Sequence, residues 1–311
     1  MTDHTLPGSI FVQDWWLDAV APGQWDAVTV EENGRVIARM PYIIRRHHGL
    51  TLLDMPLLTP HLGPWIAPLH GKYASRLKRE HQLMEQLIRK LPGFDVFTQN
   101  FHHGVTNWFP FYWQDFQQTT RYTYIIENLS DIDKIWGEFL PKRRASIRKA
   151  SKLVTVRTDM GLDTFWRLNQ MTFQRQRLQP PYSLDYLKRI DSVCAERVQR
   201  RIFFAEDARG RIHAALYLVW DDQSAYYLMG GNDPELQNSG APSLLVWEAI
   251  QFASTVTRSF DFEGSMIPGV ERFFRSFGAR QTPYFRITKV NSLAFRMRRD
   301  LRSWRQMFRK S

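Results

Sequence analysis

The sequence is poor in cysteine and contains no long hydrophobic run. Its single cysteine, Cys194, excludes an intrachain disulfide and a zinc or iron–sulfur site built from cysteines. No apolar stretch approaches the roughly 20 residues that span a bilayer. Residues 1–10 lack the basic and apolar regions of a signal peptide. We therefore expect a protein of the reducing cytoplasm.

Acidic residues are scarce in one part of the chain. The 311 residues include 42 Lys or Arg and 31 Asp or Glu, a net charge of +11. Residues 1–120 hold 10 basic and 11 acidic residues. The remaining 32 basic and 20 acidic residues give residues 121–311 a net charge of +12. This asymmetry predicts an anionic partner: a phosphate-rich ligand, nucleic acid or an anionic membrane surface. The alternative is that the charge serves solubility alone.

One order of elements occurs twice along the chain. Hydrophobic residues make up 43% of the sequence, as in an ordinary globular protein. In the first set, a helix at 73–91 precedes the last of four expected strands, at 27–32, 35–44, 50–55 and 94–98. In the second set, a helix at 243–256 precedes the last of four expected strands, at 201–206, 211–220, 225–230 and 260–263. Helices are expected between the two sets, at 131–153, 162–177 and 184–200. The pattern predicts an α/β fold built from two copies of one unit.

A strand, a loop and a helix follow one another over residues 226–256. Gly240 and Ala241 place small residues before the helix, where free backbone N–H groups and the helix dipole favour an anion. A pyrophosphate of a nucleotide-linked cofactor such as coenzyme A could approach closely there. The expected cofactor contacts are Leu228, Met229, Gln237, Asn238, Ser239, Gly240, Ala241 and Ser243.

Three stretches resemble the GNAT acyltransferase superfamily and, within it, the Fem-type branch. They are PKRRASIRKA at 141–150, GAPSLLVWEAI at 240–250, and FDFEG at 260–264 with GVERFFRSFG at 269–278. The resemblance implies two tandem GNAT-like units, each a mixed, mostly antiparallel sheet flanked by helices. It also implies transfer of an acyl or aminoacyl group to an amine of a cell-envelope sugar or peptidoglycan-type precursor.

The resemblance suggests three segments. Residues 1–118 form an N-terminal unit on the acceptor side, and residues 119–290 form the acyltransferase unit with a helical segment at 131–200. Residues 291–311 read as a basic amphipathic helix, which suits either an anionic membrane surface or packing on the domain.

The donor is not decided by the motif. Gln237 and Gly240 fit the GNAT pattern, but Pro242 stands where Gly or Ala is usual and lacks an N–H group. Acyl-CoA, such as acetyl-CoA, is the expected donor, because the chain lacks the inserted helical hairpin of some tRNA-using relatives. Aminoacyl-tRNA is the alternative, which the positive charge suits. No metal is expected.

Acyl transfer to an amine needs a base and a stabilised oxyanion. Candidate bases are Glu263 and Asp261, which strand alternation would place on one face. Tyr226 or Tyr227 could protonate a thiolate leaving group, and an N–H group near 228–230 could bind the oxyanion. Alternatively, Asp261 caps a loop and Glu263 pairs with a nearby arginine.

A basic run lies on the predicted helix at 141–150. We expect the acceptor, a phosphorylated small molecule or a lipid-linked precursor, to contact Lys142, Arg143, Arg144, Arg148, Lys149 and also Arg272. The alternative is a solvated helix face. A different function also stays open: a non-catalytic, degenerate GNAT module that binds RNA or an anionic membrane surface. Through residues 292–311 the protein could also contact the inner face of the cell membrane peripherally.

Overall fold

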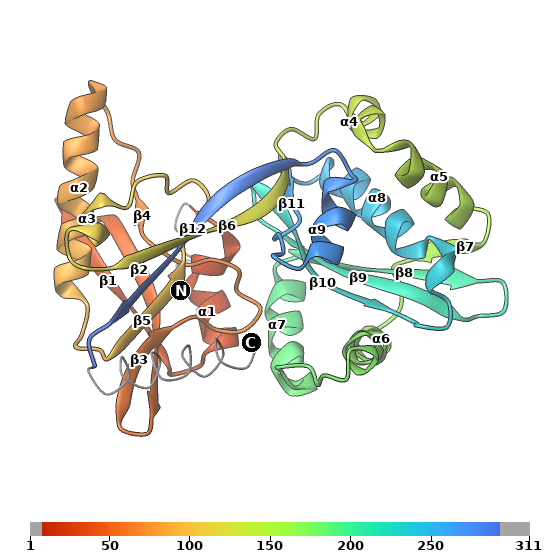
Figure 1. The fold of residues 1–311 in the computed structure, drawn as a ribbon, viewed down its shortest axis with the longest axis horizontal. Coiled ribbons are helices and arrows are strands. Elements are labelled where there is room, and N and C mark those ends of the chain that lie inside the picture. Colours follow the sequence, from red (N-terminus) through yellow and green to blue (C-terminus); the bar gives the residue numbers. More distant parts are fainter. Residues whose placement is uncertain (1–7, 293–311) are drawn as a thin grey trace, which may run out of the picture. The chain divides into compact units, whose positions relative to one another are not determined.

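The computed structural model describes residues 8–292 and divides them into two units (Figure 1). The first unit takes residues 8–12, 21–121 and 284–292, and the second takes residues 13–20 and 122–283. The chain passes from the first unit to the second within β6 (Gln117–Ile126), and it returns to the first unit within β12 (Arg280–Val290). The predicted helix at 291–311 lies almost wholly outside the described residues.

The first unit is a mixed sheet covered by a long helix. Its strand order is β1-β2-β3-β5-β12, with β4 (Trp65–Ile66) paired to β2, and only β3 and β5 run parallel. The bounds are β1 (Trp25–Glu32), β2 (Arg35–His47), β3 (Leu50–Asp54) and β5 (Val96–Asn100). The apolar face of α2 (Tyr73–Lys90) buries Leu83, Met84 and Leu87 in the same core as Met40 of β2. The short helices are η1 (Ile10–Val12) and α3 (Phe109–Tyr112).

The second unit is a mostly antiparallel sheet with helices on both faces. Its order is β6-β11-β10-β9-β8-β7, and only β10 and β11 are parallel. The bounds are β7 (Val154–Arg157), β8 (Arg200–Asp207), β9 (Ile212–Trp220), β10 (Ser224–Asn232) and β11 (Ser259–Asp261). The predicted fold class, α/β with mostly antiparallel sheets, is therefore confirmed.

Side-chain alternation along β9 divides its residues between the two helical layers. Leu216 and Leu218 join the core under α8 (Ala241–Ala253) and α5 (Pro141–Ala150). Tyr217, between them, makes an edge contact with Phe165 of α6 (Leu162–Arg175), at 5.5 Å between ring centroids. Figure 1 shows α5 and α8 over one face of this sheet and α6 and α7 (Leu184–Glu196) over the other.

An early segment of the chain completes the second unit. Helix α1 (Asp14–Val20) packs on α7, where Arg189 Nε donates to the Ala19 carbonyl at 3.2 Å. The Arg197 guanidinium lies 4.7 Å from the Trp15 ring centroid, and Trp16 is fully buried. The second unit therefore depends on residues that precede the first unit's sheet.

Two sequence predictions need correction. The helix expected over 131–153 is broken into α4 (Ile132–Glu138) and α5, because Pro141 holds Leu140 in an extended conformation. The strand expected over 260–263 ends at Asp261, since Glu263 has a left-handed backbone with φ 57°. Strand alternation therefore does not relate Asp261 to Glu263. Among residues 8–292, no helix has the length and apolar character needed to span a membrane.

Candidate active site

The two parallel strands of the second unit separate after three residue pairs. Ser224, Ala225 and Tyr226 of β10 pair with Ser259, Phe260 and Asp261 of β11. β11 ends there, whereas β10 continues to Asn232. The register between β10 and β9 shifts between Tyr227 and Met229, which makes Leu228 a bulge. Past the bulge, one edge of β10 is no longer paired with β11.

A pair of carboxyl groups lies where the strands separate. Asp261 is 5% exposed and accepts hydrogen bonds from the Thr123 hydroxyl and from the Glu263 N–H, the latter at 2.7 Å. Burial raises the pKa of Asp261 to about 6, although both hydrogen bonds act against this shift. Burial, together with the Asp261 charge, holds the pKa of Glu263 well above its usual range. A carboxyl group poised near neutral pH can act as a general base.

Glu263 has a carboxyl oxygen that forms no hydrogen bond with the rest of the described site. Its Oε1 is buried and has no hydrogen-bond partner among the described residues. Gly264, with φ 61°, follows it, and a Cβ there would collide with the carbonyl of Tyr122 and would lie 2.6 Å from the Thr123 Cα. The segment is thereby fixed against β6, where the Phe262 N–H also donates to the Tyr124 carbonyl at 2.9 Å.

The two candidate proton donors to the leaving group, Tyr226 and Tyr227, lie in different surroundings. The Tyr226 hydroxyl donates to Asp221 Oδ2 at 3.2 Å, in the turn before β10. The Tyr227 hydroxyl lies against Gly230, where a Cβ would collide with it, and burial raises the pKa of Tyr227 to about 12. Tyr227 is thus placed beside the bulge, and its role as an acid stays a prediction, as does that of Tyr226.

The loop before α8 has internal partners for its first helical N–H groups. The Ala241 N–H donates to Ser239 Oγ at 3.3 Å, and those of Ser243 and Leu244 donate to the Gly240 carbonyl at 2.9 and 3.3 Å. Pro242 has no N–H group. Each N–H group from 241 to 244 therefore has an acceptor in the chain. Binding of an anion by these N–H groups stays a prediction.

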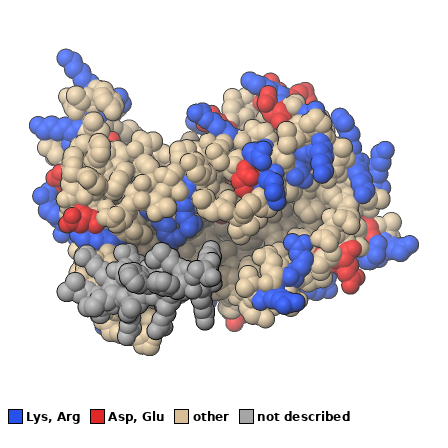
Figure 2. Space-filling model, in the orientation of Figure 1, with Lys and Arg blue, Asp and Glu red and all other residues tan. Residues whose placement is uncertain are grey.

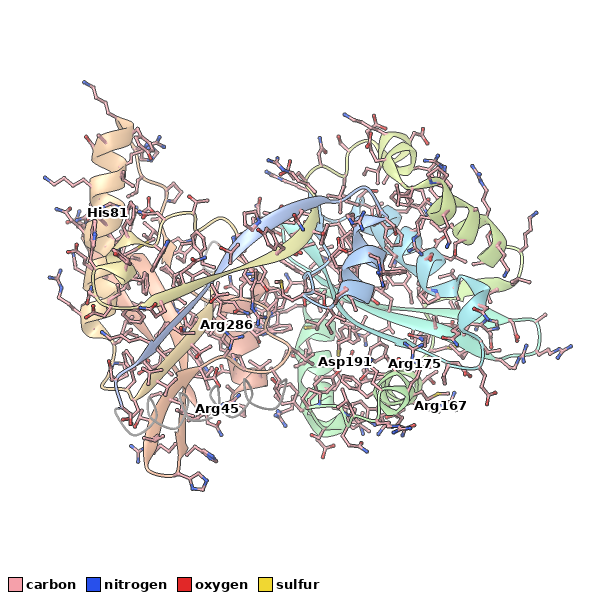
Figure 3. The ribbon with its side chains drawn as sticks, viewed as in Figure 1. Arg45, His81, Arg167, Arg175, Asp191 and Arg286 are labelled. Atoms are coloured by element: carbon pink, nitrogen blue, oxygen red, sulfur yellow. The ribbon has the colours of Figure 1, made fainter. Side chains whose placement is uncertain are left out.

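Other chain segments cover this loop. Residues Gln237–Ser239 form η2, and Gly240 has φ 80°. A Cβ on Gly240 would lie 2.6 Å from the Ser146 carbonyl of α5. Lys149 Nζ donates to the Asn238 carbonyl at 3.0 Å, and Arg175, labelled on α6 in Figure 3, donates to Gln237 Oε1 at 3.0 Å. The loop is held between α5 and α6.

The basic run on α5 divides into internal and exposed members. Arg143 donates to the hydroxyls of Ser243 and Ser276 and lies over the Phe273 ring, and burial lowers its pKa to about 10. Arg144 donates to the Gly137 and Phe139 carbonyls, at 2.7 and 2.6 Å, at the C-terminal end of α4. Both hold helices together.

The remaining predicted acceptor contacts lie at the surface. Lys142, Arg148 and Lys149 are exposed on α5, and Arg272 is exposed on α9 (Pro268–Arg275). The Arg148 guanidinium lies 5.7 Å from the Trp136 ring centroid. Figure 2 shows Lys and Arg side chains gathered over the region of α5. Among residues 8–292, no three or more His, Cys, Asp or Glu side chains lie together in a way that could hold a metal ion.

The comparisons with known proteins agree with this geometry. Residues 141–275 match the family model described as an acetyltransferase (GNAT) domain. No curated protein sequence matches the chain. The solved structure of FemX is 13% identical, with a TM-score of 0.65 over 89% of this chain and 92% of that chain.

Two further solved structures share the fold. A tandem GNAT protein from the clavulanic acid biosynthesis pathway is 12% identical, with a TM-score of 0.51 over 88% of this chain and 85% of that one. The C-terminal DUF2156 domain of a protein named as a lysylphosphatidylglycerol synthetase, from Agrobacterium fabrum, is also 12% identical, with a TM-score of 0.53 over 88% and 85%.

The residues that match the GNAT domain model contain the carboxyl pair, the bulge and the loop before α8. The chain shares the fold of FemX and of a tandem GNAT protein, and its match to the GNAT domain model supports an acyltransferase. Sequence reasoning found the carboxyl pair but missed Thr123, because its contact with Asp261 is made across β6 and β11.

Proposed function

We propose that the protein transfers an acyl or aminoacyl group to a primary amine by direct attack, at the point where β10 and β11 separate. The buried carboxyl pair of Asp261 and Glu263 is the observation that carries this proposal. The donor is an activated acyl ester or thioester, for which acyl-CoA and aminoacyl-tRNA are the two candidate carriers.

The chain's own groups support each proton and charge movement. Glu263, as the carboxylate, accepts the proton of the amine as the nitrogen attacks the acyl carbon. Backbone N–H groups near the Leu228 bulge stabilise the oxyanion that develops on the acyl oxygen. The bond from the acyl carbon to the carrier's oxygen or sulfur then breaks, and the carrier takes up the proton that Glu263 accepted from the amine. The products are an amide and the free carrier.

The acceptor we propose carries phosphate, as a cell-envelope sugar or peptidoglycan-type precursor does. The support is the net charge of +12 in residues 121–311 and the exposed Lys142, Arg148 and Lys149 on α5. Clustered cations of this kind favour phosphate groups through charge-assisted hydrogen bonds. Arg143 and Arg144 do not belong to this acceptor site, because their side chains are partly buried and each makes several hydrogen bonds within the chain, whereas Lys149 is exposed.

The test is transfer of a labelled acyl group with the Glu263→Gln variant. Acetyl-CoA and aminoacyl-tRNA are offered as donors and phosphorylated amino sugars as acceptors. We expect kcat to fall by roughly 10²- to 10⁴-fold, the usual contribution of a general base. Glu235→Gln, at an exposed position in the loop after β10, is the matched control. Unchanged turnover in Glu263→Gln would remove Glu263 from the mechanism.

A further inference from the structure

Past the bulge, two residues of β10 direct their backbone N–H and C=O groups toward the edge opposite β9. The Asp233 N–H donates to the His213 carbonyl at 3.0 Å, and the register pairs Asn232, Gly231 and Gly230 with the next residues of β9. Hydrogen-bonded and non-hydrogen-bonded pairs alternate in an antiparallel ladder. The N–H and C=O groups of Gly230 and Asn232 therefore point away from β9, toward the edge that β11 has left.

Side chains of α6 occupy this edge. Asn169 Nδ2 donates to the Gly230 carbonyl at 2.9 Å, and the Asn232 N–H donates to Thr172 Oγ1 at 3.0 Å. The Tyr182 hydroxyl donates to Asn169 Oδ1 at 3.0 Å and so orients the amide of that side chain. Asn169 is 2% exposed. Two side chains thus take the place that an added strand would occupy.

Helix α6 cannot come closer to β10 than it does here. A Cβ on Gly231 would lie 2.6 Å from the Asn169 backbone nitrogen and 2.7 Å from the Leu168 carbonyl carbon. The helix backbone is therefore in direct contact with the strand backbone. A ligand that paired with this edge would have to break both side-chain hydrogen bonds first.

Coenzyme A has two recognition features that such a site would need to satisfy. Its arm carries two amide groups, which need hydrogen-bond partners once they leave water. A free strand edge supplies such partners to an extended chain of amides. Its diphosphate suits free N–H groups at a helix N-terminus. Here the strand edge is filled by α6, and the first N–H groups of α8 have internal acceptors.

We propose that Asn169 and Thr172 are specificity-determining residues that close the edge of β10 to donors with an amide-containing arm. Tyr182 is a positioning residue that acts through Asn169. This inference rests on the proposed acyl transfer at the same site. Side chains of α6 thus select between donor carriers. They favour a carrier that forms no hydrogen bonds with β10 past the bulge.

The test is calorimetric titration of coenzyme A into the full chain and into a matched pair of variants. Thr172→Val keeps the side chain's shape but removes the acceptor of the Asn232 N–H group, whereas Thr172→Ser keeps an acceptor. Releasing one neutral hydrogen bond corresponds to about a tenfold change in affinity. We expect the Kd of Thr172→Val for coenzyme A to be about tenfold lower than that of the wild type and of Thr172→Ser.

Equal affinity of the wild type and Thr172→Val would overturn the inference, as would equal tightening in Thr172→Ser. Tyr182→Phe is a second test, because Tyr182 does not contact the strand itself. We expect its Kd for coenzyme A to lie between those of the wild type and Thr172→Val. Thermal unfolding of each variant confirms that it is folded before titration. The titration needs no turnover, so a failure of Glu263 as the base is recognised separately, in the transfer assay.

Discussion

Asp261 and Glu263 place two carboxyl groups of one short segment in an environment with little water. Coulombic repulsion from Asp261 is one of the two causes that raise the pKa of Glu263, the other being burial. Because a base works only as the carboxylate, its raised pKa moves the acidic limb of the pH–rate profile upward. The profile therefore reports the charge of Asp261 as well as the ionisation of Glu263.

The Asp261→Asn variant separates the two effects. The amide oxygen retains the hydrogen bonds from Thr123 and from the Glu263 N–H group, but the negative charge is removed. The pKa of Glu263 then falls, and we expect the acidic limb to move to lower pH. The measurement is kcat/KM against pH for the wild type and Asp261→Asn. A limb that stays in place, or that moves upward, contradicts the coupling of the two groups.

The residues that could be predicted from sequence are those whose chemistry is local. Asp261 and Glu263 stand two residues apart beside a closing strand, and this pattern was sufficient to select them. The reason given for their proximity, alternation along one strand, is wrong because Glu263 adopts a left-handed backbone. For Arg143 the sequence could not distinguish a phosphate contact from helix packing, since its partners Ser243 and Ser276 are distant along the chain.

At the scale of elements, contact between α6 and β10 depends on the absence of a side chain. The Gly231→Ala variant places a methyl group against the α6 backbone at Asn169 and Leu168, neither of which has a flexible end that could yield. We expect a loss of about 1–3 kcal/mol in the free energy of unfolding, the usual cost of overpacking. Urea unfolding measures it, and Gly93→Ala, with no atom within 4 Å of its Cβ, is the control. Equal stability of the two variants would show that the close packing is relieved at no cost.

Elements with strong local patterns were predicted with nearly correct bounds. The helix expected at 73–91 is α2 at Tyr73–Lys90, because its apolar spacing is regular over five turns. Strand β12 was missed: its sequence is RQTPYFRITKV, with a proline and several charges, and only Ile287 is buried. What makes it a strand is the partner, β5, from residues almost two hundred positions earlier. Pairing of this kind has no local signature.

At the scale of the whole molecule, the single cysteine reports on an interaction between distant parts of the sequence. Cys194 of α7 is fully buried, and burial raises its pKa to about 12, so its thiol is protected from alkylation. Helix α1, with the fully buried Trp16, packs on α7 from near the start of the chain. The protection of Cys194 therefore depends on α7 remaining in place, and α1 is one of the elements that pack against α7.

We expect Trp16→Ala to destabilise the second unit by about 3–5 kcal/mol and to speed alkylation of Cys194. Trp113→Ala, whose side chain is 55% exposed in the first unit, is the matched control. The measurement is the rate of thiol labelling in native buffer, which follows local opening of α7. Labelling at the wild-type rate in Trp16→Ala would show that α1 is not needed to cover α7.

The interleaving of the two units has a consequence for the order in which the protein is made. Strand β5 pairs with β12, whose Arg286 lies opposite Asn100, so the first unit lacks its last strand until nearly the whole chain has been synthesised. At typical ribosomal rates this interval lasts roughly 10 to 40 seconds. During that time β5 has an unpaired edge on a nascent chain, which is the kind of surface that associates with other strands. Folding of the first unit is therefore complete only after residues 286–290 have been synthesised.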